Sequence, residues 1–272
     1  FPYFRDLGTY VTLGLPLKYY FLYWMGNEEG MHIPKDLNIF TISVPVGSHL
    51  PHAVGCAMAM KLRKEAAAAI AYFGDGATSE GDFSEALNFA GVFQTPNVFI
   101  CVNNQYAIST PVRRQTAAKT LAQKALAFGF EGIQVDGNDA LAMYAVTKEA
   151  LEKARSGGGP TLIEAFTYRM GNHTTSDDAS RYRTEAEVGE WAKRDPLERF
   201  KLCLKAKSMW DESFEIRVQK EADELITKAV AEAEDTPPPS PGDIFVHTYK
   251  EMPPDLAEQL SELRESLKEE RK

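Results

Sequence analysis

Two short polar motifs in this sequence have the residue types and the spacing of a divalent-cation site. Gly74-Asp75-Gly76 follows one apolar run and Asn103-Asn104 follows the next, with 26 residues between the two motifs. A carboxylate and an amide oxygen at the ends of two adjacent parallel strands can share one Mg²⁺, which prefers oxygen ligands and takes the others from phosphate and water. The N–H groups of Gly76 and Ala77, near a helix start, can hold phosphate oxygens. The pair of motifs therefore predicts a Mg²⁺-bridged diphosphate ester.

Each motif also has a simpler interpretation when it is taken alone. Gly-Asp-Gly is a common turn sequence, and a pair of asparagines is common in surface loops, so a short motif by itself is weak evidence. The spacing favours the binding site, because a helical crossover between the motifs would place them at the ends of neighbouring parallel strands.

Alternating strands and helices are expected to position these motifs. Apolar runs predict strands at 66–73, 97–102, 132–137 and 161–168, and helical periodicity predicts helices at 52–64, 80–93, 119–129 and 139–155. The spacing of Ser79 and Asp82 predicts a cap for the helix at 80–93. This alternation indicates an α/β fold with a doubly wound, mostly parallel sheet and helices on both faces. Ligands collect at the carboxyl ends of such strands, where Gly74–Ala77, Asn103–Tyr106 and 169–178 fall.

The chain changes character after residue 183. Thr184 and Glu187 have the spacing of a capping box, and residues 184–235 are mostly charged, amphipathic helix. A Pro-rich linker follows at 236–242, and the last twenty residues predict a charged helix. We expect an α/β domain at 1–183 and a helical C-terminal extension at 184–272, packed on that domain or on a partner subunit.

Composition excludes several classes of protein. The net charge is −9, from 39 acidic and 30 basic residues, which argues against broad nucleic-acid binding. No apolar run approaches the ~20 residues of a membrane span. The cysteines Cys56, Cys101 and Cys203 form no CxxC pair, so neither a disulfide framework nor a zinc knuckle is predicted. A reduced compartment is expected, either the prokaryotic cytoplasm or the mitochondrial matrix.

Three longer segments carry a resemblance to one enzyme family. They are YFGDGATSEGDFSEALNFA, VFICVNNQYAIST and YRMGNHTTSDDASRYRT, and they resemble the alpha subunit of thiamin-diphosphate-dependent 2-oxo acid dehydrogenases, most closely the branched-chain type. The resemblance extends from Phe1 to about Glu251. It implies the thiamin-diphosphate-binding fold, oxidative decarboxylation of a 2-oxo acid, with branched-chain acids preferred, and acyl transfer to the lipoyl groups of an acyltransferase core. A pyruvate or acetoin dehydrogenase alpha subunit is the alternative.

Position within these motifs implies a set of site residues. Asp75, Asn104 and the backbone carbonyl of Tyr106 would be the ligands of Mg²⁺. His173 matches the family's active-site histidine, which would hydrogen-bond the cofactor or the reacting acyl group and order its loop. Phe4 stands where a tyrosine is usual, which removes one phosphate hydrogen bond. The implied contacts of thiamin diphosphate are Phe4, Arg5, Val44, Val46, Asp75, Gly76, Ala77, Asn104, Arg169 and His173.

Several residues of the third segment keep a structural interpretation. A lone histidine in a loop is often structural, although the polar loop around His173 favours the functional role. For Asp177, Tyr182 and Arg183, holding the loop in place is at least as good an interpretation as chemistry. Thr174 occupies the position that regulatory kinases modify as serine in mitochondrial relatives, and a phosphate there would repel the cofactor diphosphate.

A second ion site is implied by four residues before the first helix. Ser43, Pro45, Ser48 and His49 match a monovalent-cation loop, for K⁺, of the branched-chain members. His49 replaces an amide side chain, however, and we favour a structural role for it at the helix entry. Val102 is a further departure, because some relatives have an arginine there that reaches the diphosphate.

The resemblance also implies a partner. Thiamin diphosphate needs a carboxylate from a second, pyrimidine-binding domain, and a single α/β unit of this length cannot supply one. The resemblance assigns that carboxylate to a separate beta subunit in an α2β2 heterotetramer, so this chain alone would be inactive. Two other classes remain open: a single-chain thiamin enzyme, which the missing domain argues against, and a non-catalytic assembly protein that retains the fold.

Overall fold

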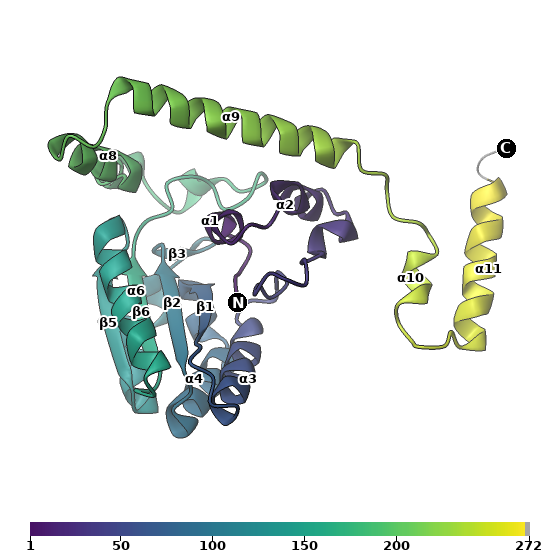
Figure 1. Ribbon diagram of the computed structural model, residues 1–272, viewed down its shortest axis with the longest axis horizontal. Coiled ribbons are helices and arrows are strands. Elements are labelled where there is room, and N and C mark those ends of the chain that lie inside the picture. Colours follow the sequence, from purple (N-terminus) through teal and green to yellow (C-terminus); the bar gives the residue numbers. More distant parts are fainter. Residues whose placement is uncertain (270–272) are drawn as a thin grey trace. The chain divides into compact units, whose positions relative to one another are not determined.

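The computed structural model describes residues 1–269 (Figure 1). The chain divides into two compact units. The α/β unit contains Phe1–Tyr10 and Asn38–Val218, and the helical unit contains Val11–Leu37 and the chain from residue 219 onward. The expected boundary after residue 183 does not coincide with this division, since residues 184–218 belong to the compact α/β unit. Whether residues 184–272 form a separate extension stays a prediction.

The sheet of the α/β unit has four parallel strands in the order β1-β2-β6-β5. The strands are β1 (Ala69–Gly74), β2 (Asn97–Asn103), β5 (Glu131–Asp136) and β6 (Thr161–Phe166). The four predicted strands and the doubly wound α/β class are therefore confirmed. The register pairs Gly74 with Val102 and Asn103 with Phe166, so both polar motifs leave the sheet at the same edge.

Helices cover both faces of this sheet (Figure 1). Along β2, Phe99 and Cys101 point into one core and Val98 and Ile100 into the other, as in parallel sheets that are buried on both sides. The first core lies under α3 (His49–Leu62), α4 (Gly81–Phe93) and the 3-10 helix η3 (Ala122–Phe128), and the second lies under α6 (Ala140–Arg155).

Of two local predictions in this region, one is confirmed and one is wrong. The helix predicted at 119–129 is present as the 3-10 helix η3. Its first residue donates its N–H to the carboxylate of Glu164 at 2.9 Å, and its carbonyl lies so close to Gly132 that a Cβ there would be 1.9 Å away. Ser79 does not cap α4, because it belongs to the 3-10 helix η2 (Asp75–Ser79), and Glu80 occupies the N-cap without a side-chain bond.

The N-terminal residues extend the sheet beyond β1. The N-terminal amine of Phe1 donates to the carbonyl of Ile70 at 2.8 Å, and the N–H of Tyr72 donates to Phe1 at 2.9 Å. Tyr3 then forms a parallel bridge with Ser43. These pairs run parallel to β1, so the segments that follow Tyr3 and Ser43 emerge at the same edge as Gly74.

Short helices and a hairpin complete the α/β unit. The predicted cap at Thr184 is confirmed, since its side chain accepts the N–H of Glu187 at 3.3 Å. The predicted charged helix at 184–235 is divided into α7 (Glu185–Ala192), α8 (Pro196–Ala206) and α9 (Glu212–Glu234), the last of which continues past Val218. The remaining elements are α1 (Leu7–Thr12), whose last two residues are assigned to the helical unit, β3 (Tyr106–Ala107), β4 (Thr110–Pro111), α5 (Val112–Gln115) and η4 (Ala179–Arg181).

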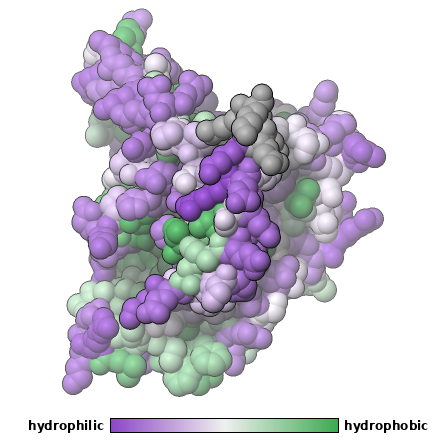
Figure 2. Space-filling model, turned by 90° about the vertical axis from the view of Figure 1, so that its right-hand side faces the viewer, coloured by the Kyte–Doolittle hydropathy of each residue, from purple (hydrophilic) through white to green (hydrophobic). Residues whose placement is uncertain are grey.

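The helical unit contains α2 (Leu17–Trp24), η1 (Glu28–Met31), α10 (Asp243–Val246) and α11 (Pro254–Glu269). The predicted linker at 236–242 forms neither helix nor strand, and α11 confirms the charged helix near the C-terminus as far as residue 269. Within the described chain, no helix combines the length and apolar composition that a membrane crossing requires. Figure 2 shows a mainly hydrophilic face interrupted by hydrophobic areas.

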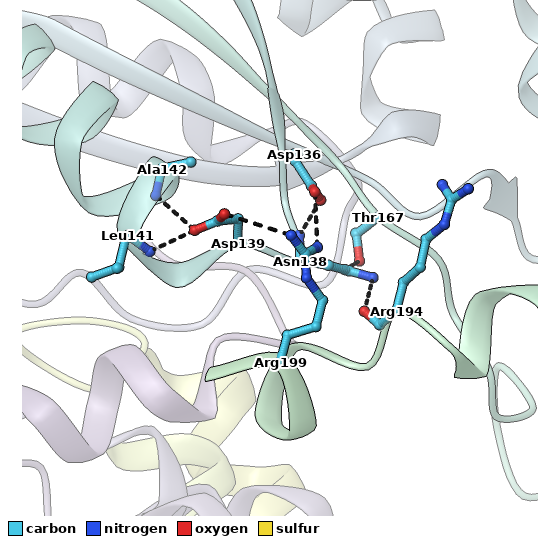
Figure 3. A network of polar contacts seen from close by, with 8 residues as sticks. All are labelled: Asp136, Asn138, Asp139, Leu141, Ala142, Thr167, Arg194 and Arg199. Atoms are coloured by element: carbon cyan, nitrogen blue, oxygen red, sulfur yellow. Dashed lines mark hydrogen bonds and ion pairs between the residues drawn. The ribbon is translucent and has the colours of Figure 1, made fainter. Parts of the chain in front are cut away.

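A polar network ties the turn between β5 and α6 to α8 and to the end of β6 (Figure 3). Arg199 pairs with Asp136 at 2.8 Å and with Asp139 at 3.5 Å. The buried side chain of Asn138 accepts from the Thr167 hydroxyl at 2.5 Å and donates to the carbonyl of Arg194 at 2.9 Å. The network therefore holds α8 and the turn before it against the edge of the sheet from which the third polar segment emerges.

Replacing Asn138→Ala is expected to destabilise the fold by about 2–4 kcal/mol, because it leaves the Thr167 hydroxyl and the Arg194 carbonyl without their partner. The midpoint of thermal unfolding should fall by roughly 5–10 °C. Circular dichroism melts measure this, with the exposed Asn88→Ala on α4 as the matched control. Equal melting temperatures for the two variants would show that the network adds no stability.

Candidate active site

Asp75 is a buried carboxylate at the end of β1. The residue is 1% exposed, and Oδ2 of its carboxylate accepts a hydrogen bond from Gln115 Nε2 at 2.7 Å. Burial raises the pKa of Asp75, and hydrogen bonds from Gln115 and from the backbone of Asp75 and Asn104, together with the charge of Arg169, oppose that rise. The carboxylate thus lies beside the second polar motif, in a place where a cation would stabilise its charged form.

Gly76 allows a close approach between the two motifs. A Cβ at Gly76 would lie 2.9 Å from the Cβ of Ala107, so a side chain there would push away the β3–β4 hairpin. The neighbouring Ala77 is also buried, within the same 3-10 helix. Backbone N–H groups of η2 therefore lie next to the hairpin that carries Tyr106 and directly follows Asn104.

The two asparagines of the second motif have different surroundings. Asn103 donates through Nδ2 to the carboxylate of Glu164 at 2.7 Å, which makes it part of the support beneath the turn. Asn104 accepts the N–H of Tyr106 at its Oδ1 at 3.3 Å. The carbonyl of Tyr106 accepts from Arg169 Nη1 at 3.2 Å and keeps a second lone pair. Asn104 and the Tyr106 carbonyl thus remain candidates as ligands.

These donors fit Mg²⁺. One carboxylate, one amide oxygen and one backbone carbonyl are a hard, oxygen-only set, and Mg²⁺ takes few ligands from protein. Among residues 1–269 no group of three or more His, Cys, Asp and Glu side chains is placed to hold a metal, which is the kind of cluster that zinc sites use. The arrangement therefore suits a cation that shares its coordination with a phosphate ester.

His173 lies between two arginines. Its Nδ1 is 2.8 Å from Arg5 Nη2 and 3.3 Å from Arg169 Nη1, and the ring of Phe4 meets the imidazole edge-on at 6.4 Å between centroids. Guanidinium groups only donate, so Nδ1 is the acceptor and the proton of the neutral ring is on Nε2. Burial, then Arg5 and Arg169, lower the pKa of His173, whereas Asp177 opposes them.

The loop around His173 is held at several points. Arg169 donates to the carbonyl of Ile108 at 2.7 Å and to the Tyr182 hydroxyl at 2.8 Å. Asp177 accepts from the N–H of His173 at 2.7 Å and from Tyr182 at 2.6 Å. Arg183 donates to the carbonyls of residues 169–171. The prediction that Asp177, Tyr182 and Arg183 hold the loop is confirmed, and Arg169 also anchors it.

Three of the four predicted ligands of a monovalent cation lie together. The hydroxyls of Ser43 and Ser48 are 2.7 Å apart, and Ser48 donates to the carbonyl of Pro45 at 2.8 Å. His49 instead donates from Nε2 to the carbonyl of Tyr72 at 2.7 Å, which supports its structural role at the helix entry. The cation itself stays a prediction, as do cofactor contacts by the exposed Val44 and Val46 of the same loop.

Two polar residues at this edge, the buried Glu164 and the half-buried Gln115, escaped the sequence analysis. Glu164 on β6 is 1% exposed and accepts from Asn103 at 2.7 Å, from Gln134 at 3.1 Å and from the N–H of Ala122 at 2.9 Å. A glutamate inside the apolar run TLIEAF was a signal that could have identified it. Gln115 had no such signal, because only the tertiary fold brings it to Asp75.

The position of His173 predicts how it titrates. Replacing Arg5→Gln removes a positive charge beside the imidazole, so the pKa of His173 should rise towards the ordinary value of histidine. The neutral ring would then begin to take up its proton at a higher pH than in the unmodified protein. Histidine NMR titration measures this shift, and Arg114→Gln, exposed on α5, is the control. An unchanged His173 titration in Arg5→Gln would contradict the arrangement.

Comparison with known proteins defines the class of protein. The dehydrogenase E1 component family matches residues 1–242, and the chain belongs to this family. The pyruvate dehydrogenase E1 component subunit alpha of Acholeplasma laidlawii is 48% identical over 273 residues, covering 98% of this chain and 78% of the relative. The 3-methyl-2-oxobutanoate dehydrogenase subunit alpha of Mycobacterium tuberculosis is 45% identical over 267 residues, covering 98% and 73%. The predicted resemblance to 2-oxo acid dehydrogenase alpha subunits is confirmed.

Proposed function

We propose that this chain is the alpha subunit of a thiamin-diphosphate-dependent 2-oxo acid dehydrogenase. With a beta subunit it would carry out oxidative decarboxylation of a 2-oxo acid and acyl transfer to lipoyl groups of an acyltransferase core. Family membership implies the use of thiamin diphosphate. The observation that carries the proposal is the meeting of the buried Asp75, the Asn104 turn and the Arg5–His173–Arg169 cluster at one edge of the sheet.

The residues of this edge divide into two groups by their chemistry. Asp75, Asn104 and the Tyr106 carbonyl would hold Mg²⁺, which neutralises part of the charge of the diphosphate. Backbone N–H groups at Gly76 and Ala77 would bind the phosphate oxygens, as N–H groups at helix starts do. When bound, thiamin diphosphate supplies a carbon nucleophile and an electron sink for decarboxylation.

His173 and its arginines form the second group. Arg5 and Arg169 hold the imidazole through Nδ1, which leaves a neutral ring that donates from Nε2. A neutral donor of this kind can hydrogen-bond the cofactor or a reacting carbonyl without adding a full charge. Arg5 additionally brings a positive charge towards the diphosphate, and the bonds of Asp177 to the loop keep His173 in place.

Partners complete the proposal. A beta subunit would supply the carboxylate that the cofactor requires, in an α2β2 heterotetramer. The exposed Phe89, Val92 and Phe93 on α4, between 46% and 67% accessible, support a protein partner, because contiguous apolar surface commonly marks an interface. The same proposal includes binding of K⁺ at Ser43, Pro45 and Ser48. It also includes a location in the prokaryotic cytoplasm or the mitochondrial matrix.

Cofactor titration tests the function. In the purified complex with the beta subunit, calorimetry should show binding of thiamin diphosphate that disappears when Mg²⁺ is removed by chelation. Titration of Mg²⁺ into the chelated complex should restore it. If thiamin diphosphate does not bind in the presence of Mg²⁺, the proposed enzymatic function is refuted. That result would favour a non-catalytic assembly protein that retains the fold.

The substrate class needs a separate experiment. Relatives named for pyruvate and for 3-methyl-2-oxobutanoate match at 48% and 45% identity, so they do not separate the two. We keep the branched-chain acid as the preferred substrate and pyruvate as the alternative, with acetoin as a third possibility. The branched-chain preference requires kcat/KM for 3-methyl-2-oxobutanoate to exceed that for pyruvate by about tenfold or more, the range in which apolar pockets discriminate side chains. The reverse ratio would assign pyruvate.

A further inference from the structure

We infer that Gln115 is a positioning residue for Asp75, which sets the orientation of the carboxylate that binds Mg²⁺; the inference rests on the proposed function. Gln115 is the last residue of α5. Its Nε2 donates to Asp75 Oδ2 at 2.7 Å and to the carbonyl of Thr110 at 3.1 Å. Both N–H bonds of the amide are therefore used, and one of them fixes an oxygen of the buried carboxylate.

Gln115 lies on α5, which directly follows the hairpin that carries Tyr106. Asn104 is followed by β3 and β4, which pair antiparallel. Val112 then donates its N–H to the carbonyl of Gln105 at 3.1 Å and packs against the main core. The short helix α5 thus starts from a fixed point, and its end contacts η2. Gln115 links the Asp75 motif to the hairpin of Asn104 through side-chain atoms.

The bond has a direct consequence for a metal ligand. A carboxylate has about four lone-pair positions, and a bond to Oδ2 restricts its rotation while leaving other positions for backbone N–H groups and a cation. Partners of this kind orient metal ligands, and their loss typically weakens metal binding by about 10–100-fold. Gln115 Oε1 is buried without a hydrogen-bond partner among the described residues. Mg²⁺ usually keeps several bound waters, and such a water would be a hydrogen-bond donor for Gln115 Oε1.

Mg²⁺ affinity in the α/β complex tests this inference. Gln115→Met keeps the length of the side chain and removes the amide, and the control is Gln123→Met, at an exposed position of η3. Calorimetric titration of Mg²⁺ at saturating thiamin diphosphate should give a Kd about 10–100-fold higher for Gln115→Met and an unchanged Kd for the control. The cofactor-free melting temperature should stay close to that of the unmodified complex, and kcat should recover at saturating Mg²⁺, which a purely structural role does not predict.

A second variant covers the case in which Gln115→Met fails to fold. Gln115→Asn keeps the amide but shortens the chain by one methylene, so the bond to Asp75 is out of reach and the same rise in Kd is expected. A Kd within about threefold of the unmodified complex in a folded variant would overturn the positioning role and leave the proposed function intact. Failure of the unmodified complex to bind thiamin diphosphate with Mg²⁺ would overturn both.

Discussion

Asp75→Ala is expected to abolish Mg²⁺-dependent binding of thiamin diphosphate and to lower kcat/KM of the α/β complex by at least about 10³-fold. The physical reason is the loss of the only carboxylate among the three predicted ligands, since metal ions supply several kcal/mol of charge stabilisation and about 4 kcal/mol corresponds to a factor of 10³. Decarboxylation measured with an artificial electron acceptor, together with calorimetry of cofactor binding, checks both parts. Survival of the activity at its original level would show that the metal assignment is wrong.

Asp75→Asn separates metal binding from stability. Burial raises the pKa of Asp75, so the folded state holds the proton more tightly than the unfolded chain does. The stability that this adds is fully present below the ordinary carboxyl pKa of ~4 and is lost as the pH rises through the folded pKa. At neutral pH the asparagine variant avoids this loss. The cofactor-free variant should therefore melt at the same temperature as the unmodified chain or above it, while its Mg²⁺ binding is lost.

His173→Ala has the second largest expected effect, a fall in kcat of about 10²–10⁴-fold with a much smaller change in the Kd of thiamin diphosphate. The variant removes the Nε2 donor that we propose for the reacting centre and retains the proposed ligands of the metal. It also deprives Arg5 and Arg169 of the acceptor that they share. Steady-state kinetics of the α/β complex and calorimetric cofactor titration measure the two quantities separately.

The control for this variant is His247→Ala, since His247 is exposed and lies in the helical unit. Its kinetics should match those of the unmodified complex. A His173→Ala variant that loses cofactor affinity in the same proportion as kcat would assign His173 to binding alone. A His173→Ala variant that retains kcat would show that His173 has only a structural role, as a lone loop histidine often does.

Much of the sheet was predictable, since its strands are short apolar runs separated by helical periodicity. The run NVFICV becomes β2 because both faces of a parallel strand are covered. The capping residue at Thr184 was likewise a local signal. Ser79 does not cap α4 because it is the last residue of the 3-10 helix that begins at Asp75. The helix predicted at 119–129 is a 3-10 helix whose first residue lies in close contact with Gly132. These outcomes depend on packing that local patterns do not contain.

The sequence by itself determined the family, the sheet and the two motifs whose spacing brings Asp75 and Asn104 to one edge, because strand patterns and crossovers are encoded within short segments. Only the tertiary structure decided which polar groups surround them. In the folded chain Asn103 donates to Glu164, so the two asparagines have different partners. Gln115, 40 positions from Asp75 in the sequence, donates to the Asp75 carboxylate. The tertiary structure also placed His173 between Arg5 and Arg169. The distances between such residues depend on how loops pack at the end of the sheet, a property of the whole fold.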